Sequence, residues 1–308
     1  MIEKNNHICI SGRNGGNNMT GMPITKEIEQ QVINYYLSKP MTESEVANKF
    51  NLCKPTIGKI LANNDIKIYK KNQLFSPDLI EDYFETINSE HKAYFLGLII
   101  SDGCIYSKNN KQNLVGITLQ DKDKYILDIF KKEIKTNKSI TSDNRGCSSI
   151  QILSNKMVSD LEVYGLCDNK SLKTIFPKNI DDKYYPHLIR GLLDGDGSVS
   201  FYARPNKKSH VKAIRFCQGN EQFLLDLVEY LKTHAEIKSV NLYKEKDSLW
   251  SIAYRNNESM YKLIHYLYGN ATIYLSRKKE LCIKIYNEIN HYHGNAEITK
   301  TNKSVLVS

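Results

Sequence analysis

The sequence predicts an α+β protein in which two similar units are related by a pseudo-twofold axis and follow a small all-α domain. Two observations lead to this prediction. The larger part of the chain contains one pattern twice, and the region before it holds short segments with the apolar spacing of helices. A chain of 308 residues is long enough to form a separate core for each of these parts.

The composition is that of a soluble globular protein, with 41% hydrophobic and 25% charged residues. The net charge of +9 favours a polyanionic partner such as nucleic acid. No apolar stretch approaches the length of a membrane span. The seven cysteines are odd in number and scattered, which argues against a disulfide framework or a zinc site and indicates a reducing, cytoplasmic compartment.

After a Gly- and Asn-rich leader (1–24), residues 25–72 form the predicted all-α domain. The segment 26–38 has helical spacing, and Thr42 with Glu45 forms the capping-box pattern at the start of a second helix. Asn51 follows that helix where a turn needs positive φ. A third helix begins with Pro55 in its first turn.

Two of these short helices, joined by a tight turn, fit a helix-turn-helix. Ala47 lets the helices approach each other. The shared core would consist of Val46, Phe50, Leu52, Ile57 and Ile60. The last helix would offer Lys54, Thr56 and Lys59 to a DNA major groove. A plain three-helix packing module is the alternative.

The repeat follows a linker (73–79) and occupies 80–178 and 179–293, with a C-terminal tail at 294–308. The stretch KAYFLGLIISDGCI (92–105) resembles HLIRGLLDGDGSVS (187–200). Further on, an alignment of the two copies pairs Gln120 with Gln218. Each copy is interpreted as helix, strand, loop, strand, helix, with further strands near 149–154 and 240–254.

Small residues recur every four positions in the two repeated helices, including Gly97 and Gly191, so one face of each allows close backbone packing. Helices that cross there bring Asp102 and Asp196 together, each predicted as the last helical residue before a glycine of positive φ (Gly103, Gly197). The helix dipole opposes each carboxylate by ~0.3–1 kcal/mol. A divalent cation would remove that cost, and oxygen ligands favour Mg²⁺. A simple Asp-Gly turn is the alternative.

These motifs, FLGLIISDG (95–103) and IRGLLDGDG (189–197), resemble the signature of the LAGLIDADG homing endonucleases. The resemblance covers about 80–293. It implies two αββαββα units with saddle-shaped antiparallel sheets that straddle double-stranded DNA at a long specific site. It also implies a monomeric enzyme that hydrolyses phosphodiesters on both strands with Mg²⁺ (or Mn²⁺).

Carried over to this chain, the resemblance makes Asp102 and Asp196 the metal ligands. Asp194 is expected to be an interface or capping residue. Polar residues that organise water around the metals would be Gln120, Gln218, Lys170 and Lys278, with Arg277 as the alternative to Lys278. The expected DNA-facing residues of strand 210–218 are His210, Lys212 and Arg215, and the loop before it would offer Arg204, Lys207 and Lys208 to phosphates.

Two alternatives stay open at this point. Some transcription regulators join a degenerate domain of this kind to a helix-turn-helix, although such domains usually lose the acids that both motifs keep here. An intron RNA maturase is the second alternative, with intron RNA as its partner.

Overall fold

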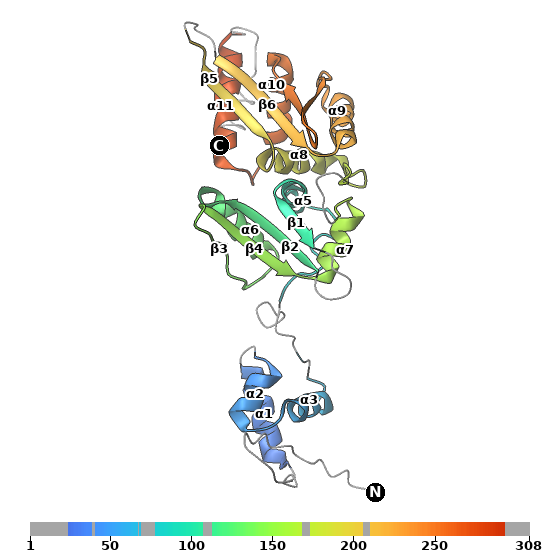
Figure 1. Ribbon diagram of the computed structural model, residues 1–308, viewed down its shortest axis with the longest axis vertical. Helices are drawn as coiled ribbons and strands as arrows, with labels where there is room; N and C mark the ends of the chain where they lie inside the picture. Colours follow the sequence, from blue (N-terminus) through green and yellow to red (C-terminus); the bar gives the residue numbers. More distant parts are fainter. Residues whose placement is uncertain are drawn as a thin grey trace. The chain divides into compact units, whose positions relative to one another are not determined.

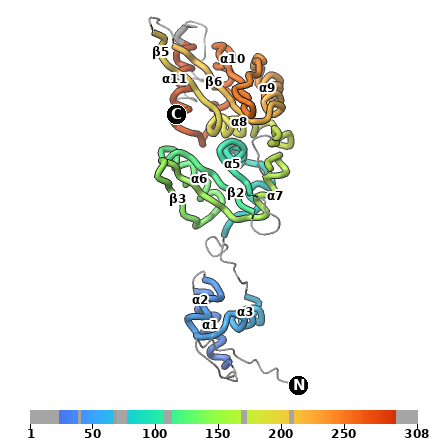
Figure 2. The backbone as a smooth tube through the Cα atoms, in the orientation of Figure 1, coloured from blue at the N-terminus to red at the C-terminus, as the bar shows by residue number. Residues whose placement is uncertain are grey.

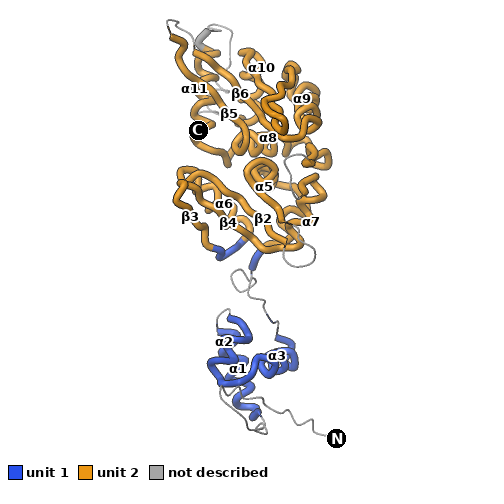
Figure 3. The backbone as a smooth tube through the Cα atoms, in the orientation of Figure 1, with its two compact units in different colours: residues 1–79, 135–138 blue, residues 80–134, 139–308 orange. Residues whose placement is uncertain are grey.

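The computed structural model describes residues 24–38, 41–66, 68, 78–106, 113–167, 173–205 and 210–292. The chain divides into two compact units (Figure 3): unit 1 comprises residues 1–79 with 135–138, and unit 2 comprises residues 80–134 with 139–308. In the described part of the chain, no helix combines the length and the apolar composition that a membrane crossing requires.

Unit 1 contains the helices α1 (Lys26–Ser38), α2 (Glu43–Phe50) and α3 (Lys54–Asn63). The predicted capping box is present: the Thr42 hydroxyl accepts from the Glu45 backbone N–H (3.2 Å), and the Glu45 carboxylate accepts from the Thr42 N–H (2.6 Å). Asn51 ends α2 in the left-handed conformation with φ 55°. The predicted core is also formed, with Phe50 packed at its margin.

Unit 2 contains the two repeats (Figure 1). The elements of the first repeat are α5 (Glu90–Ser101), β1 (Gly103–Tyr106), β2 (Leu114–Gln120), η1 (Asp121–Asp123), α6 (Lys124–Glu133), β3 (Thr141–Ser142), β4 (Cys147–Leu153) and α7 (Asn155–Val163). Those of the second are η3 (Asp182–Tyr184), α8 (Tyr185–Asp194), β5 (Ser198–Ala203), β6 (His210–Gln218), α9 (Glu221–Ala235), β7 (Leu242–Lys246), β8 (Leu249–Tyr254), α10 (Asn257–Tyr268) and α11 (Ser276–Tyr292).

Each repeat builds one antiparallel four-stranded sheet, in the orders β1-β2-β4-β3 and β5-β6-β8-β7. The predicted α+β class and its duplicated unit are therefore confirmed. Both sheets bury one face: α5, α6 and α7 contact the first sheet, and α8, α9 and α11 contact the second. We call the opposite side of each sheet its open face.

Side-chain burial alternates along the central strands, as a one-sided sheet requires. In β2, Ile117 and Leu119 are buried while Thr118 and Gln120 are exposed. Strand β6 buries Ile214, Phe216 and Gln218. The odd-numbered residues of β6 therefore lie on the open face.

Candidate functional site

The centre of unit 2 is the contact between α5 and α8, where the two helices touch backbone to backbone (Figure 2). A methyl group on Gly97 would lie 3.0 Å from the backbone N of Leu192, and one on Gly191 would lie 2.8 Å from the backbone N of Leu98. Optimal contacts between carbon atoms are ~3.5–4 Å, so a side chain at either position would force the helices apart. The small-residue stripes thus form the helix contact that the sequence predicted.

The ends of these helices also meet. A methyl group on Gly195 would lie 2.5 Å from Ser101 Cβ and 3.3 Å from the backbone N of Asp102. Asp196 follows Gly195 directly in the chain. The structure therefore brings Asp102 and Asp196 to the same end of the helix pair, although the two motifs lie far apart in the sequence.

The two helices end at earlier residues than predicted. Helix α5 ends at Ser101, and Asp102 is its C-cap with φ −85°. Helix α8 ends earlier relative to its motif, at Asp194, so that Asp196 lies two residues beyond the helix. The prediction that both acids are the last helical residues was therefore wrong.

The motif glycines serve a different purpose from the one predicted. Among the described glycines, Gly146 and Gly165 have positive φ, whereas Gly103 and Gly197 do not. A methyl group on Gly103 would lie 2.6 Å from the Cα of Ile99, and the same approach occurs at Gly197. Both glycines are needed because the chain turns back closely against the last turn of its own helix.

Asp194 lies inside the interface between the repeats. Its side chain is fully buried, and Oδ2 accepts from the Tyr94 hydroxyl (2.9 Å) and the Leu275 backbone N–H (2.7 Å). Oδ1 is buried without a hydrogen-bond partner. Burial raises the pKa of Asp194 to about 6, against the opposing effects of the Leu275 N–H and the Lys278 charge. This placement agrees with the expectation of an interface residue.

Lys278 lies beside the second motif, as the resemblance implied, but it is enclosed. Its side chain belongs to the first turn of α11 and is 4% exposed. Its Nζ donates to backbone carbonyls of the second motif, and burial lowers the pKa of Lys278 to about 8. The ammonium group is thus engaged by the backbone that carries Asp196.

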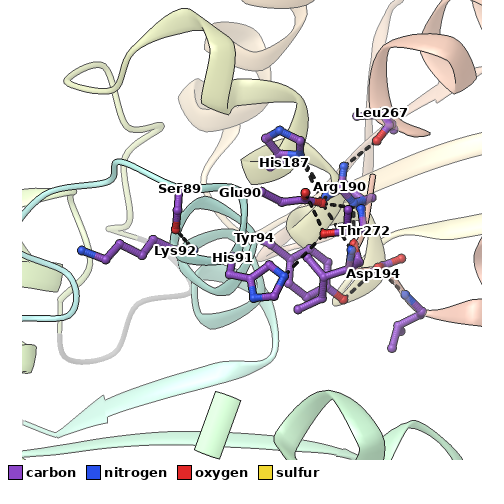
Figure 4. Close-up of polar contacts among 12 residues, drawn as sticks. Ser89, Glu90, His91, Lys92, Tyr94, His187, Arg190, Asp194, Leu267 and Thr272 are labelled. Carbon is purple, nitrogen blue, oxygen red and sulfur yellow. Dashed lines mark hydrogen bonds and ion pairs between the residues drawn. The ribbon is translucent and has the colours of Figure 1, made fainter. Parts of the chain in front are cut away.

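A buried ion pair that sequence reasoning missed joins the two helices (Figure 4). The Arg190 side chain is 0% exposed and donates to Glu90 Oε1 (2.6 Å), and to the carbonyls of Leu267 (2.5 Å) and Ile273 (2.8 Å). Glu90 also accepts from the Thr272 hydroxyl (2.8 Å). The sequence did contain one sign of this ion pair: a single arginine lies inside the apolar run LIRGLL, which the helix buries.

The two glutamines do not occupy equivalent positions. In the first repeat Cys104 pairs with Gly116, whereas its counterpart in the second repeat, Ser198, pairs with Arg215. The structural counterpart of Gln218 is therefore Leu119, one residue before Gln120. The pairing made from the sequence was wrong by one position, and a shift of one residue exchanges the faces of a strand. Gln120 is exposed on the open face, and Gln218 is buried.

The polar residues of β6 also divide between the two faces. His210 and Lys212 lie on the covered face, where both pair with Glu288 of α11 (Lys212 Nζ at 3.1 Å). The expectation that they face DNA was wrong, because residues 210 and 212 share the parity of the buried Ile214. Arg215 lies on the open face and pairs with Glu245 of β7 (3.3 Å).

In unit 1, the three residues expected to reach a major groove differ in exposure. Lys54 and Lys59 are exposed on α3. Thr56 is 7% exposed, and its hydroxyl contacts the Cys53 thiol (2.9 Å). Thr56 is therefore directed into the domain, which corrects its assignment as a groove contact.

Several expected residues fall outside the described part of the chain. These are Lys170, Lys207 and Lys208, together with the leader up to residue 23, most of the linker and the tail from residue 293. Arg204, at the end of β5, is described and exposed.

The donor set at the helix ends is one of oxygen atoms. Among the described residues, no three His, Cys, Asp or Glu side chains gather in the manner of a closed metal cage. Two carboxylates at a helix-pair end supply hard oxygen ligands, which fit a divalent cation that takes its other ligands from water or phosphate.

Comparisons with known proteins support the fold. No family model matches the chain, and no curated protein matches it by sequence. Among solved structures, it is similar to the LAGLIDADG homing endonuclease I-GzeII in complex with its DNA target, with 14% identity over 70% of this chain and 95% of that one (TM-score 0.50). It is also similar to the meganuclease I-SmaMI bound to uncleavable DNA, with 14% identity over 70% and 96% (TM-score 0.50). The chain therefore has the two-domain LAGLIDADG fold.

Proposed function

We propose that unit 2 is a site-specific endonuclease that hydrolyses both strands of double-stranded DNA, using divalent metal ions held by Asp102 and Asp196. The observation that carries this proposal is the convergence of the two motif acids at one end of a backbone-to-backbone helix contact. Carboxylates at the negative ends of two helices oppose both dipoles and each other. A role in binding cations explains why both motifs keep the acid.

Asp102 and Asp196 would hold Mg²⁺ or Mn²⁺ with oxygen ligands completed by water and DNA phosphates. When bound, such ions lower the pKa of a coordinated water and stabilise the charge of phosphodiester hydrolysis. The chain's own contribution is to fix the spacing of the two acids through the glycine contact. Gln120, on the open face at the end of β2, is a candidate for orienting water near Asp102. Gln218, and Lys170 outside the described residues, are the further candidates.

The open faces of the two sheets are the proposed DNA-contacting surface. Arg215 lies on the open face, where it would contact a base edge or a phosphate, and the exposed Arg204 directly follows β5. I-GzeII and I-SmaMI were both solved with DNA, and the net charge of +9 suits the same partner. In unit 1, the exposed Lys54 and Lys59 suit a second DNA contact, which would raise affinity by tethering.

The test is cleavage of DNA that carries candidate sites, taken from uninterrupted alleles of the host gene, with Mg²⁺ or with EDTA. We expect double-strand cleavage only with the metal and its loss in Asp196→Asn. Asp181→Asn is the matched control, because it makes the same change at an exposed acid in the segment before α8. Cleavage that survives in Asp196→Asn would contradict the assignment of the metal ligand.

The same samples separate the other functions. Tight, salt-sensitive DNA binding without cleavage under any metal condition would indicate a transcription regulator. Preferential binding to intron RNA, with faster splicing, would indicate a maturase. Either result would replace the endonuclease proposal.

A further inference from the structure

The Lys278 ammonium lies in a nest of backbone carbonyls. Its Nζ donates to the carbonyl oxygens of Leu193 (2.6 Å), Asp194 (2.7 Å), Gly195 (3.1 Å) and Gly197 (2.7 Å). An ammonium group has three N–H donors, so four carbonyl acceptors use its whole donor capacity. Two of these carbonyls flank Asp196 in the chain.

These carbonyls lie at and just beyond the C-terminal end of α8. The last carbonyls of a helix have no intrahelical partner and carry the negative end of its dipole. At Gly195 the backbone leaves the helix, with φ −73° and ψ −101°. In α5 the C-cap is Asp102 itself, whose N–H donates to the Leu98 carbonyl (2.9 Å), whereas in α8 the corresponding bond is made by Gly195, one residue before Asp196. The backbone that carries Asp196 is thus held from outside the helix.

Lys278 is itself fixed by both repeats. The Leu275 N–H donates to Asp194 of α8 (2.7 Å). From the first repeat, the Tyr125 hydroxyl accepts from the Ser276 N–H (2.8 Å), and Asp123 accepts from Arg277 Nε (2.9 Å). The start of α11 is therefore anchored before Lys278 reaches the motif.

We infer that Lys278 is a positioning residue that sets the conformation of residues 195–197 and so aims the Asp196 carboxylate. This role differs from that of the water-organising lysine that the resemblance implied, because the N–H donors of Lys278 are directed at backbone carbonyls and not at an open site. The inference rests on the proposed function only in treating Asp196 as a metal ligand.

The first test does not depend on activity. Hydrogen exchange of the backbone amides of residues 195–199 is compared in the wild type, Lys278→Met and Lys278→Arg. Lys284→Met serves as the control, because it removes an exposed lysine from the same helix. We expect exchange to be about 10-fold faster in Lys278→Met and unchanged in the control, since opening of this segment no longer breaks the ammonium contacts. Unchanged exchange in Lys278→Met would overturn the inference.

The second test separates positioning from proton transfer. Loss of a residue that orients a metal ligand typically weakens metal affinity by about 10–100-fold. We therefore expect the half-saturating Mg²⁺ concentration for cleavage to rise by about 10-fold or more in Lys278→Met, with the shape of the pH–rate profile kept. Lys278→Arg should restore part of the affinity. If the pH–rate profile of Lys278→Met loses its acidic or basic limb while the metal affinity is unchanged, the inference is overturned.

These results remain distinguishable from failure of the proposed function. If the wild type does not cleave DNA, the endonuclease proposal fails while the exchange experiment still tests the carbonyl contacts. If Lys278→Met does not fold, Lys278→Arg takes its place, because a planar guanidinium cannot match four carbonyls that converge on one nitrogen. Backbone amide exchange as slow in Lys278→Arg as in the wild type would then overturn the inference.

Discussion

Replacing Gly191 with alanine tests whether the backbone contact between α5 and α8 sets the geometry of the site. The new methyl group would lie 2.8 Å from the Leu98 N and 3.1 Å from the Gly97 carbonyl carbon, and closer still to the Tyr94 carbonyl oxygen. These atoms are backbone and cannot rotate away. The helices must therefore separate by several tenths of an ångström or more to reach the ~3.5–4 Å of ordinary contacts.

The energetic cost follows from two opposing effects. Overpacking of a tight interior costs about 1–3 kcal/mol or more, while alanine gains about 1 kcal/mol over glycine in helix propensity. We expect a net loss of up to about 2 kcal/mol, which for a domain of this size lowers the Tm of unit 2 by up to about 4–8 °C. Because a misplacement near 1 Å can reduce catalysis by about 100-fold, cleavage should fall far more than stability does.

The assays are thermal unfolding and single-turnover DNA cleavage at saturating Mg²⁺. Gly58→Ala in α3 is the matched control, since its methyl group would approach only the flexible carboxylate end of Glu43. That variant should keep or raise the stability of unit 1, by up to about 1 kcal/mol. If Gly191→Ala keeps the stability and the cleavage rate of the wild type, the close helix contact does not set the site.

Three further variants test the surrounding structure. Burial and the neighbouring Arg190 lower the pKa of His187 to about 4. The neutral imidazole therefore contributes to the stability of unit 2 above pH 6.5, and this contribution is lost as the pH falls toward 4. In urea unfolding over this pH range, the wild type should lose up to about 3 kcal/mol more stability than His187→Asn. Glu90→Ala leaves the buried Arg190 guanidinium unpaired and should destabilise unit 2 by about 3–5 kcal/mol in the same assay, with a smaller effect for Glu90→Gln. Thr42→Ala removes the capping box and should cost unit 1 about 1 kcal/mol by thermal unfolding; an unchanged transition would mean that the cap contributes nothing.

The parts of the site that the sequence predicted are those determined by local pattern. Glycines four residues apart predict a close helix contact, and the duplicated Asp-Gly predicts that two acids meet there. Asn51 and the Thr42–Glu45 pair likewise encode their own local conformations. In each case the physical cause lies within a few residues of the feature.

The missed details depend on partners that are distant in the sequence. In β6, Lys212 occupies a covered position because Glu288 of α11 neutralises it there, so the strand's alternation is obscured. The end of α8 likewise differs from that of α5 because Lys278 arrives from α11 to hold the carbonyls. Alignment of the two repeats could not reveal either difference, since α11 has no counterpart among the described elements of the first repeat.

The interface between the repeats therefore combines two physically different constraints. The contact of Gly97 with Gly191 fixes how closely α5 and α8 approach, but glycine surfaces alone leave sliding and rotation weakly determined. Directional hydrogen bonds supply what is missing: Glu90 accepts from the backbone N–H of Thr272 (2.7 Å), and Asp194 accepts from the loop that leads into α11 and from α5. Leaving a buried polar group without its hydrogen bond costs free energy, so these bonds select one register of the two helices. An otherwise symmetric helix pair thereby acquires a single relative placement of its two acids.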